Sequence, residues 1–97
     1  MKAEDVLSIL RRYEGDLRAR GVRRAALFGS VARGDSRTGS DIDIMVEIEP
    51  EAPVGIFEYS ELKEYIASLF DDSVDVVSRD HLKPFIRRAI ADAIYAF

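Results

Sequence analysis

The strongest constraint on the fold lies in residues 41–49, which alternate between acidic and apolar side chains with Met45 as the one exception. Successive side chains of a β-strand point to opposite faces, so this alternation predicts a strand. One face of that strand is apolar and consists of Ile42, Ile44, Val46 and Ile48. The other face is largely acidic, and the segment from Pro50 to Pro53 ends the strand. The apolar face must be buried, which requires a sheet with other elements packed on it.

Three longer segments show helical periodicity. Residues 5–20, residues 56–70 and the segment from Leu82 to Phe97 each place apolar side chains at steps of three and four, as amphipathic helices do. Gly21 follows the first segment, in the position of a glycine that ends a helix. We expect these three helices to cover the predicted sheet.

Shorter elements lie between them. The apolar runs 25–28 and 74–77 predict two further strands. Ser30 could cap a short helix over roughly 31–35, and Gly34 to Gly39 has the composition of a loop. The order of elements is helix, strand, short helix, strand, helix, strand, helix. It predicts an α/β (α+β) domain in which a small mixed β-sheet is packed with helices.

Length and composition limit the possible functions. Ninety-seven residues suffice for one domain, residues 1–97, with a modest core. No apolar run approaches the ~20 residues of a membrane span, no signal peptide is evident, and cysteine is absent. We therefore expect a cytoplasmic protein with no membrane partner. The net charge of −4 argues against direct binding of nucleic acid.

The acidic face of the central strand is a candidate metal site. Asp41 and Asp43 lie two residues apart, so both side chains leave the same face with about 7 Å between their Cα atoms. Asp75 would join them if its strand is a neighbour. Such carboxylates select Mg²⁺ or Mn²⁺, and three of them could hold two ions for phosphoryl or nucleotidyl transfer. The alternative is an exposed acidic strand face, which is our interpretation of Glu47 and Glu49.

Gly29 and Ser30 form a candidate phosphate site directly after a predicted strand. A glycine there lets the backbone approach a ligand closely, and the start of a helix offers unpaired N–H groups to phosphate oxygens. Ser30 adds a hydroxyl, and Arg33 could reach the same anion. The alternative is a serine that only caps a helix. Ser40, which directly precedes Asp41, is also counted among the candidate nucleotide-binding residues.

Three other patterns carry no function. The spacing from Gly29 to Gly34 is that of a phosphate-binding P-loop, but Asp35 stands at the lysine position and would repel phosphates. Arg33-Gly34-Asp35 spells a cell-adhesion tripeptide by coincidence in a chain without an evident export signal. His81 has no partner histidine or cysteine, so we expect a surface or capping residue rather than a metal ligand.

The order of the motifs is more specific than any one of them. Gly29-Ser30, ten intervening residues and Asp41-x-Asp43 form the pattern GS-x10-D-x-D. With it, the segment LFGSVARGDSRTGSDIDIMVEIEP resembles the MNT-domain (MntA-like) minimal nucleotidyltransferases of the DNA polymerase β-like superfamily, and the likeness covers essentially the whole chain. The resemblance implies that Gly29 and Ser30 bind the triphosphate, that Asp41 and Asp43 hold metal ions, and that Asp75 is the third, catalytic carboxylate.

The same resemblance implies an activity. Proteins of this family pair with a HEPN-domain toxin and transfer AMP from ATP to a tyrosine hydroxyl of that toxin, with Mg²⁺ as the cofactor. We therefore expect a protein adenylyltransferase that acts as a type VII-like antitoxin. Three alternatives stay open: a non-catalytic antitoxin that neutralises its partner by binding, a transferase for a small molecule or an RNA end, and a purely structural protein. A chain this short leaves little surface to enclose an acceptor, which favours an acceptor on a partner protein.

Overall fold

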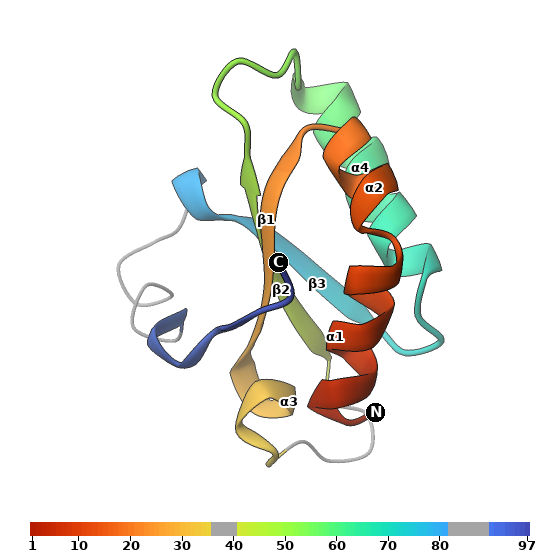
Figure 1. Ribbon diagram of the computed structural model, residues 1–97, viewed down its shortest axis with the longest axis vertical. Helices are drawn as coiled ribbons and strands as arrows, with labels where there is room; N and C mark the ends of the chain where they lie inside the picture. Colours follow the sequence, from red (N-terminus) through yellow and green to blue (C-terminus); the bar gives the residue numbers. More distant parts are fainter. Residues whose placement is uncertain (36–40, 82–89) are drawn as a thin grey trace.

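The computed structural model describes residues 1–35, 41–81 and 90–97 and has a four-stranded sheet at its centre (Figure 1). The strands are β1 (Val22–Phe28), β2 (Ile42–Ile48), β3 (Val74–Ser78) and β4 (Ile94–Tyr95). Their order in the sheet is β3-β2-β1-β4. β1 pairs antiparallel with β2 and with β4, whereas β2 and β3 are parallel. The predicted α/β class with a small mixed sheet is confirmed.

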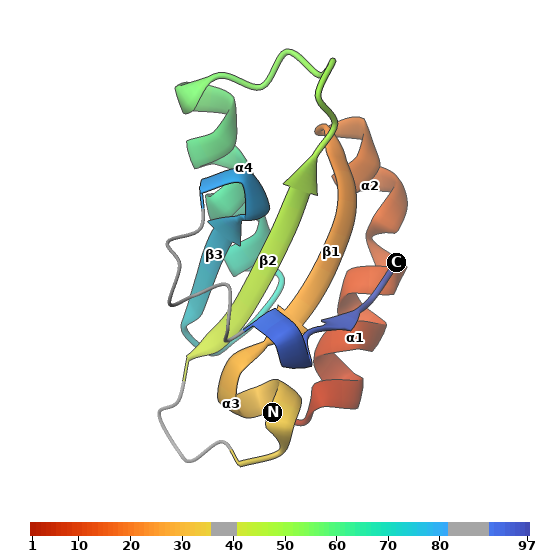
Figure 2. The same ribbon diagram turned by 90° about the vertical axis from the view of Figure 1, so that its left-hand side faces the viewer.

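The longer helices lie together on one face of this sheet (Figures 1 and 2). The helices are α1 (Ala3–Arg12), α2 (Glu14–Ala19), α3 (Gly29–Arg33) and α4 (Ile56–Ser68), with 3₁₀ turns η1 (Arg79–His81) and η2 (Ile90–Asp92). α4 is the crossover that parallel strands such as β2 and β3 require. None of the described helices has the length and apolar character needed to span a bilayer.

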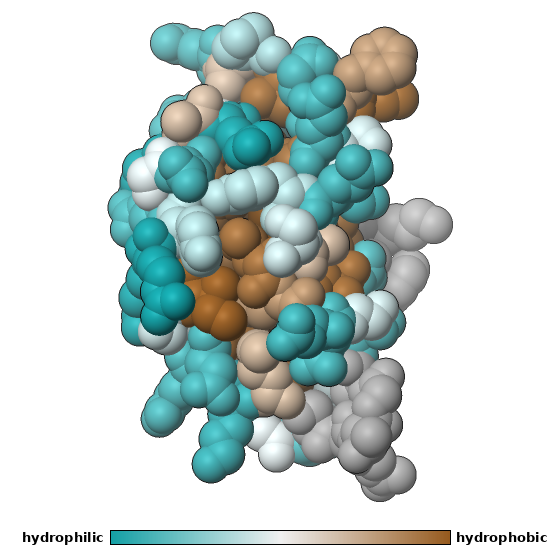
Figure 3. All heavy atoms as spheres, turned by 90° about the vertical axis from the view of Figure 1, so that its right-hand side faces the viewer, coloured by the Kyte–Doolittle hydropathy of each residue, from teal (hydrophilic) through white to brown (hydrophobic). Residues whose placement is uncertain are grey.

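The alternation of β2 decides which side chains meet the helices. Ile44 and Val46 are fully buried in the main core, between the sheet and the helices. The helices contribute Val6, Leu10, Leu17, Leu62 and Ile66 to the same core. Seen from the helical side, apolar side chains gather in the middle of the molecule with polar ones around them (Figure 3). A smaller core on the opposite face joins Met45 of β2 to Ile90 and Ala93 of the C-terminal segment.

The helix predicted over residues 5–20 is two helices, α1 and α2. Tyr13 lies between them, with φ −101° and ψ 16°. Gly15 occupies the first turn of α2, and glycine is the poorest helix former after proline, which agrees with a break at this point. Leu10 and Leu17 are both fully buried on either side of the break, so the apolar periodicity continues through it and does not reveal it.

The strand predicted over residues 25–28 begins earlier, at Val22. Arg23 and Arg24 are exposed, and because they are charged, the apolar run that predicted the strand did not include its first residues. Gly21, which precedes β1, has a φ of +98°, so the predicted role of a glycine that ends the first helical segment is confirmed.

The helix predicted from Leu82 to Phe97 is wrong where the structure describes that segment. Its described part forms η2 and β4, while residues 82–89 lie outside the described residues. β4 pairs with β1, and the backbone N–H of Ala96 donates to the carbonyl of Ala25 at 2.8 Å. The backbone N–H and C=O groups along the edge of β1 need hydrogen-bonding partners. The C-terminal segment supplies them as β4, and it therefore forms a strand there instead of the predicted helix.

The two cores predict a contrast between two isoleucines. Ile44→Ala should lower the free energy of unfolding by about 2–5 kcal/mol, because Ile44 is fully buried and its loss leaves a cavity. Ile56→Ala removes the same atoms from a side chain that is 80% exposed and should change stability by less than about 0.5 kcal/mol. Urea unfolding of both variants checks this, and equal costs would contradict the described core.

Candidate active site

The candidate site lies at one end of the sheet, where β1 runs into α3 and where β2 and β3 begin (Figure 2). Phe28, the last residue of β1, pairs with Asp43 of β2, and Asp43 pairs with Asp75 of β3. Paired residues of neighbouring strands place their side chains on the same face. The two carboxylates therefore stand side by side, on the face opposite the main core. The strands of Asp43 and Asp75 are neighbours, which was the condition for the predicted site.

The carboxylates of the site act on one another electrostatically. Partial burial raises the pKa of Asp43 above its ordinary value, and the negative charges of Asp75 and then Asp41 raise it further. The guanidinium of Arg33 opposes them and lowers the pKa. Three carboxylates and one cation predicted from the sequence are thus close enough to influence the same proton equilibrium.

Gly29 packs directly against the central carboxylate of this group. Its φ of +78° lies in the left-handed region, which allows the chain to turn sharply at the end of β1. A Cβ atom at this position would overlap the carboxylate oxygen of Asp43 and come within 3.2 Å of the Asp43 Cβ. Glycine is therefore required here for two reasons, the backbone conformation and the close approach to Asp43.

The sequence suggested that Ser30 caps a short helix, but in the structure it does not. The short helix expected over 31–35 begins at Gly29, and no side chain caps it. Ser30 lies in the first turn of α3, half-buried, so its hydroxyl is not used as a cap. Arg33 donates from Nε to the carboxylate of Asp35 at 3.2 Å. Phosphate binding by these residues remains a prediction, and Ser40 lies outside the described residues.

The residues present fit a divalent cation. Among the described residues, no three acidic or histidine side chains are already arranged closely enough to hold a metal ion. The mutual repulsion around Asp43 is nevertheless the electrostatic condition that a bound cation relieves, and carboxylate oxygens are the ligands that Mg²⁺ prefers. Asp41, Asp43 and Asp75 are therefore the candidate ligands.

Two polar residues make contacts that were not predicted from the sequence, Tyr59 near the site and Glu47 further along β2. Tyr59 on α4 has a pKa above its ordinary value. Burial raises the pKa, the negative charge of Asp75 raises it further, and a hydrogen bond with the backbone of Ser78 lowers it. Tyr59 lies in the helix predicted over residues 56–70, where the sequence pattern places it on the apolar stripe. Glu47, interpreted as an exposed acid, is largely buried and forms an ion pair with Arg79 at 3.2 Å. No motif in the sequence marks either contact.

Comparison with known families decides what kind of site this is. Residues 8–95 match the family described as Nucleotidyltransferase domain. The chain belongs to this family. It is 39% identical to the protein adenylyltransferase MntA of Thermococcus cleftensis over 90% of this chain and 87% of that protein. The resemblance to the MntA-like minimal nucleotidyltransferases is thereby confirmed, and the chain is an enzyme of the nucleotidyltransferase class.

Comparison with solved structures shows the same nucleotidyltransferase fold. One protein described as a minimal nucleotidyltransferase superimposes with a TM-score of 0.76 and 30% identity, over 97% of this chain and 95% of that one. A chain from the complex of a tri-AMPylated Shewanella oneidensis HEPN toxin with an MNT antitoxin superimposes with a TM-score of 0.64 and 20% identity, over 94% of this chain and 71% of that one. At that identity the second likeness concerns the fold alone.

Gly29→Ala should destabilise the nucleotidyltransferase more than Gly34→Ala. Both glycines have a φ of +78°, so alanine costs about 1–2 kcal/mol of backbone strain at either position. The added Cβ meets none of the described residues within 4 Å at Gly34 but overlaps the carboxylate of Asp43 at Gly29. Urea unfolding measures the difference, and the excess should largely disappear in Gly29→Ala/Asp43→Ala. Equal costs for the two single variants would contradict the packing of Gly29 against Asp43.

The raised pKa of Asp43 predicts a pH dependence of stability in metal-free buffer. A carboxyl whose folded-state pKa lies above its unfolded value favours folding at low pH, and this contribution is lost as the pH rises through the folded-state pKa. Asp43→Asn carries no charge, so it should be more stable than the wild type near pH 7. The gap should close as the pH falls toward the ordinary value of 3.8. Urea unfolding as a function of pH checks this, and a variant less stable at every pH would contradict it.

Proposed function

We propose that this nucleotidyltransferase transfers AMP from ATP to a hydroxyl group, in particular a tyrosine hydroxyl, of a HEPN-domain toxin. The reaction depends on Mg²⁺, with Mn²⁺ as a substitute, and takes place in the cytoplasm. The chain thereby acts as an antitoxin that inactivates its partner covalently. Support comes from the relative named as a protein adenylyltransferase and from the fold shared with the MNT antitoxin bound to an AMPylated HEPN toxin.

The observation that carries the proposal is the pairing of Asp43 with Asp75 next to the Gly29 turn. A nucleotidyl transfer needs carboxylates that hold divalent cations beside a segment of backbone that accepts phosphates. Asp41, Asp43 and Asp75 would hold Mg²⁺, which neutralises the charge of the triphosphate when it is bound. A purely structural protein has no need for a cluster of three carboxylates in which two raise the pKa of the third.

The chain's own residues have three tasks in the reaction. Ser30, the backbone of Gly29 and Ser30, Arg33 and Ser40 bind and orient the triphosphate. Asp75 is exposed on β3, the outermost described strand on that side of the sheet, and receives the proton of the acceptor hydroxyl. The acceptor oxygen forms a bond to the α-phosphorus as the bond to the β-phosphate oxygen breaks, and pyrophosphate leaves. A phosphodiester between AMP and the acceptor results.

A non-catalytic antitoxin is the second candidate function, because blocking by binding requires only a surface that fits the toxin. The two functions differ in the mass of the partner after co-expression. One or more added AMP units on the HEPN protein support transfer. An unmodified partner in a stable complex supports blocking.

Asp41→Asn and Asp43→Asn should each reduce the transfer of label from [α-³²P]ATP to the HEPN partner by about 100-fold or more, because each removes a charge that the cation needs. Label from [γ-³²P]ATP should not be transferred, since that phosphate leaves with pyrophosphate. Asp71→Asn makes the same substitution at an exposed position in the turn between α4 and β3 and should retain full transfer. Full activity of either site variant would overturn the mechanism.

A further inference from the structure

Two large apolar side chains project from the first turn of α4. Ile56 is 80% exposed and Phe57 is 79% exposed, the highest values among the large apolar residues reported for the described part of the chain. Isolated exposed apolar residues are ordinary, but adjacent ones beside an apolar hollow indicate a contact surface. Such a hollow of about 570 Å³ adjoins them, and its apolar lining consists of Ile48, Pro50, Ala52, Val54, Ile56 and Tyr59.

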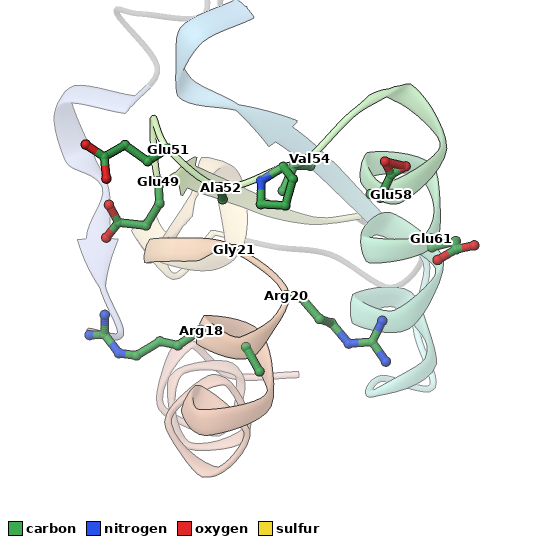
Figure 4. A pocket seen from close by; sticks show the side chains of 11 residues that line it. Arg18, Arg20, Gly21, Glu49, Glu51, Ala52, Val54, Glu58 and Glu61 are labelled. Carbon is green, nitrogen blue, oxygen red and sulfur yellow. The ribbon is translucent and has the colours of Figure 1, made fainter.

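Acidic side chains lie beside this apolar surface. Glu49 lines the hollow itself. Glu51 of the loop after β2 and Glu58 and Glu61 of α4 line a second hollow, which shares Glu49, Ala52 and Val54 with the first, and these four glutamates form an acidic rim on that side (Figure 4). None of the four forms an ion pair with a basic residue of the described chain. The rim therefore keeps its negative charge and is available to a positively charged surface.

The arginines closest to this rim are engaged elsewhere. Arg18 forms an ion pair with Glu14, with 2.7 Å between nitrogen and oxygen. Arg20 lies over the ring of Tyr65, with its guanidinium carbon 4.0 Å from the ring centre.

The apolar surface borders β3 through Tyr59, which lines the hollow together with Ser78 at the end of that strand. Ile56 and Tyr59 are three residues apart on α4, so they share one side of the helix. Tyr59 lines the hollow, and its hydroxyl is near enough to Asp75 for that charge to raise its pKa. A protein seated on the first turn of α4 therefore lies alongside β3, the strand that carries Asp75.

We propose that Ile56, Phe57 and the adjoining hollow, with its rim of glutamates, form the surface on which the protein acceptor docks before transfer. The partner presents an apolar protrusion surrounded by lysine or arginine side chains. A second copy of this chain does not fit, because the same acidic rim would face itself. The inference rests on the proposed function in one respect, which is that the docked protein carries the acceptor hydroxyl.

Binding and transfer should be measured separately with the double variant Ile56→Ala/Phe57→Ala and a HEPN-domain protein as the partner. Calorimetry should give a dissociation constant at least 10-fold larger than that of the wild type. The partner concentration for half-maximal label transfer should rise by a similar factor, while the maximal transfer at saturating partner and its dependence on ATP stay unchanged. Ile94→Ala is the matched control, since Ile94 is 38% exposed on β4 at the other edge of the sheet, and it should bind normally.

The acidic rim is tested by Glu49→Gln/Glu61→Gln, which should slow association and weaken its dependence on salt. Glu64→Gln, exposed on α4 but outside both hollows, should do neither. Unchanged binding by Ile56→Ala/Phe57→Ala, or self-association of the wild type that this variant abolishes, would overturn the docking surface. A wild-type chain that binds the partner through Ile56 and Phe57 but never labels it would instead refute the proposed function and leave the surface standing.

Discussion

The apolar face of β2 fixes the position of everything at the site end of the sheet. Ile42, Ile44 and Val46 are at most 1% exposed. A shift of the strand by one residue would move all three out of the core and turn Asp43 into it. Hydrophobic burial alone sets the cost of that exchange at several kcal/mol, at about 25 cal/mol for each Å² exposed. Because β3 pairs with β2 residue by residue, the same constraint also places Asp75 beside Asp43.

The arrangement that the core imposes is unfavourable for the carboxylates themselves. Asp43 is partly buried, and two neighbouring carboxylates raise its pKa further. The turn at Gly29 adds a conformation that other residues adopt only with strain, pressed against the same carboxylate. Local features that oppose stability and are held by their surroundings are characteristic of functional sites. In this chain the main core supplies the free energy that keeps them together.

The sequence predicted those parts of the fold in which one residue pattern excludes the alternatives. The alternation around Ile44 required a strand, and it placed Asp43 on the face away from the core. The C-terminal segment was mispredicted because its apolar residues also fit a helix, and only the free edge of β1 selects β4 instead. Tyr59 fitted its helical stripe, but the reach of its hydroxyl toward Asp75 depends on how α4 packs beside β3. Contacts of this kind arise between elements and leave no trace in local periodicity.

The connection from β2 through α4 to β3 determines how an acceptor can be presented. In a parallel pair joined by a crossover helix, the starts of both strands lie at one end of the sheet and the start of the helix lies near the other. The acidic site and the first turn of α4 are therefore separated by about the length of β3, roughly 16 Å for five residues. A protein interface of ordinary size, with about 800 Å² on each partner, covers such a distance. The separation is set by a strand rather than by a loop, so a docked partner must itself carry its hydroxyl at a matching distance. With the proposed docking, selection of the acceptor depends on the shape of the partner, so this domain can be specific without enclosing its substrate.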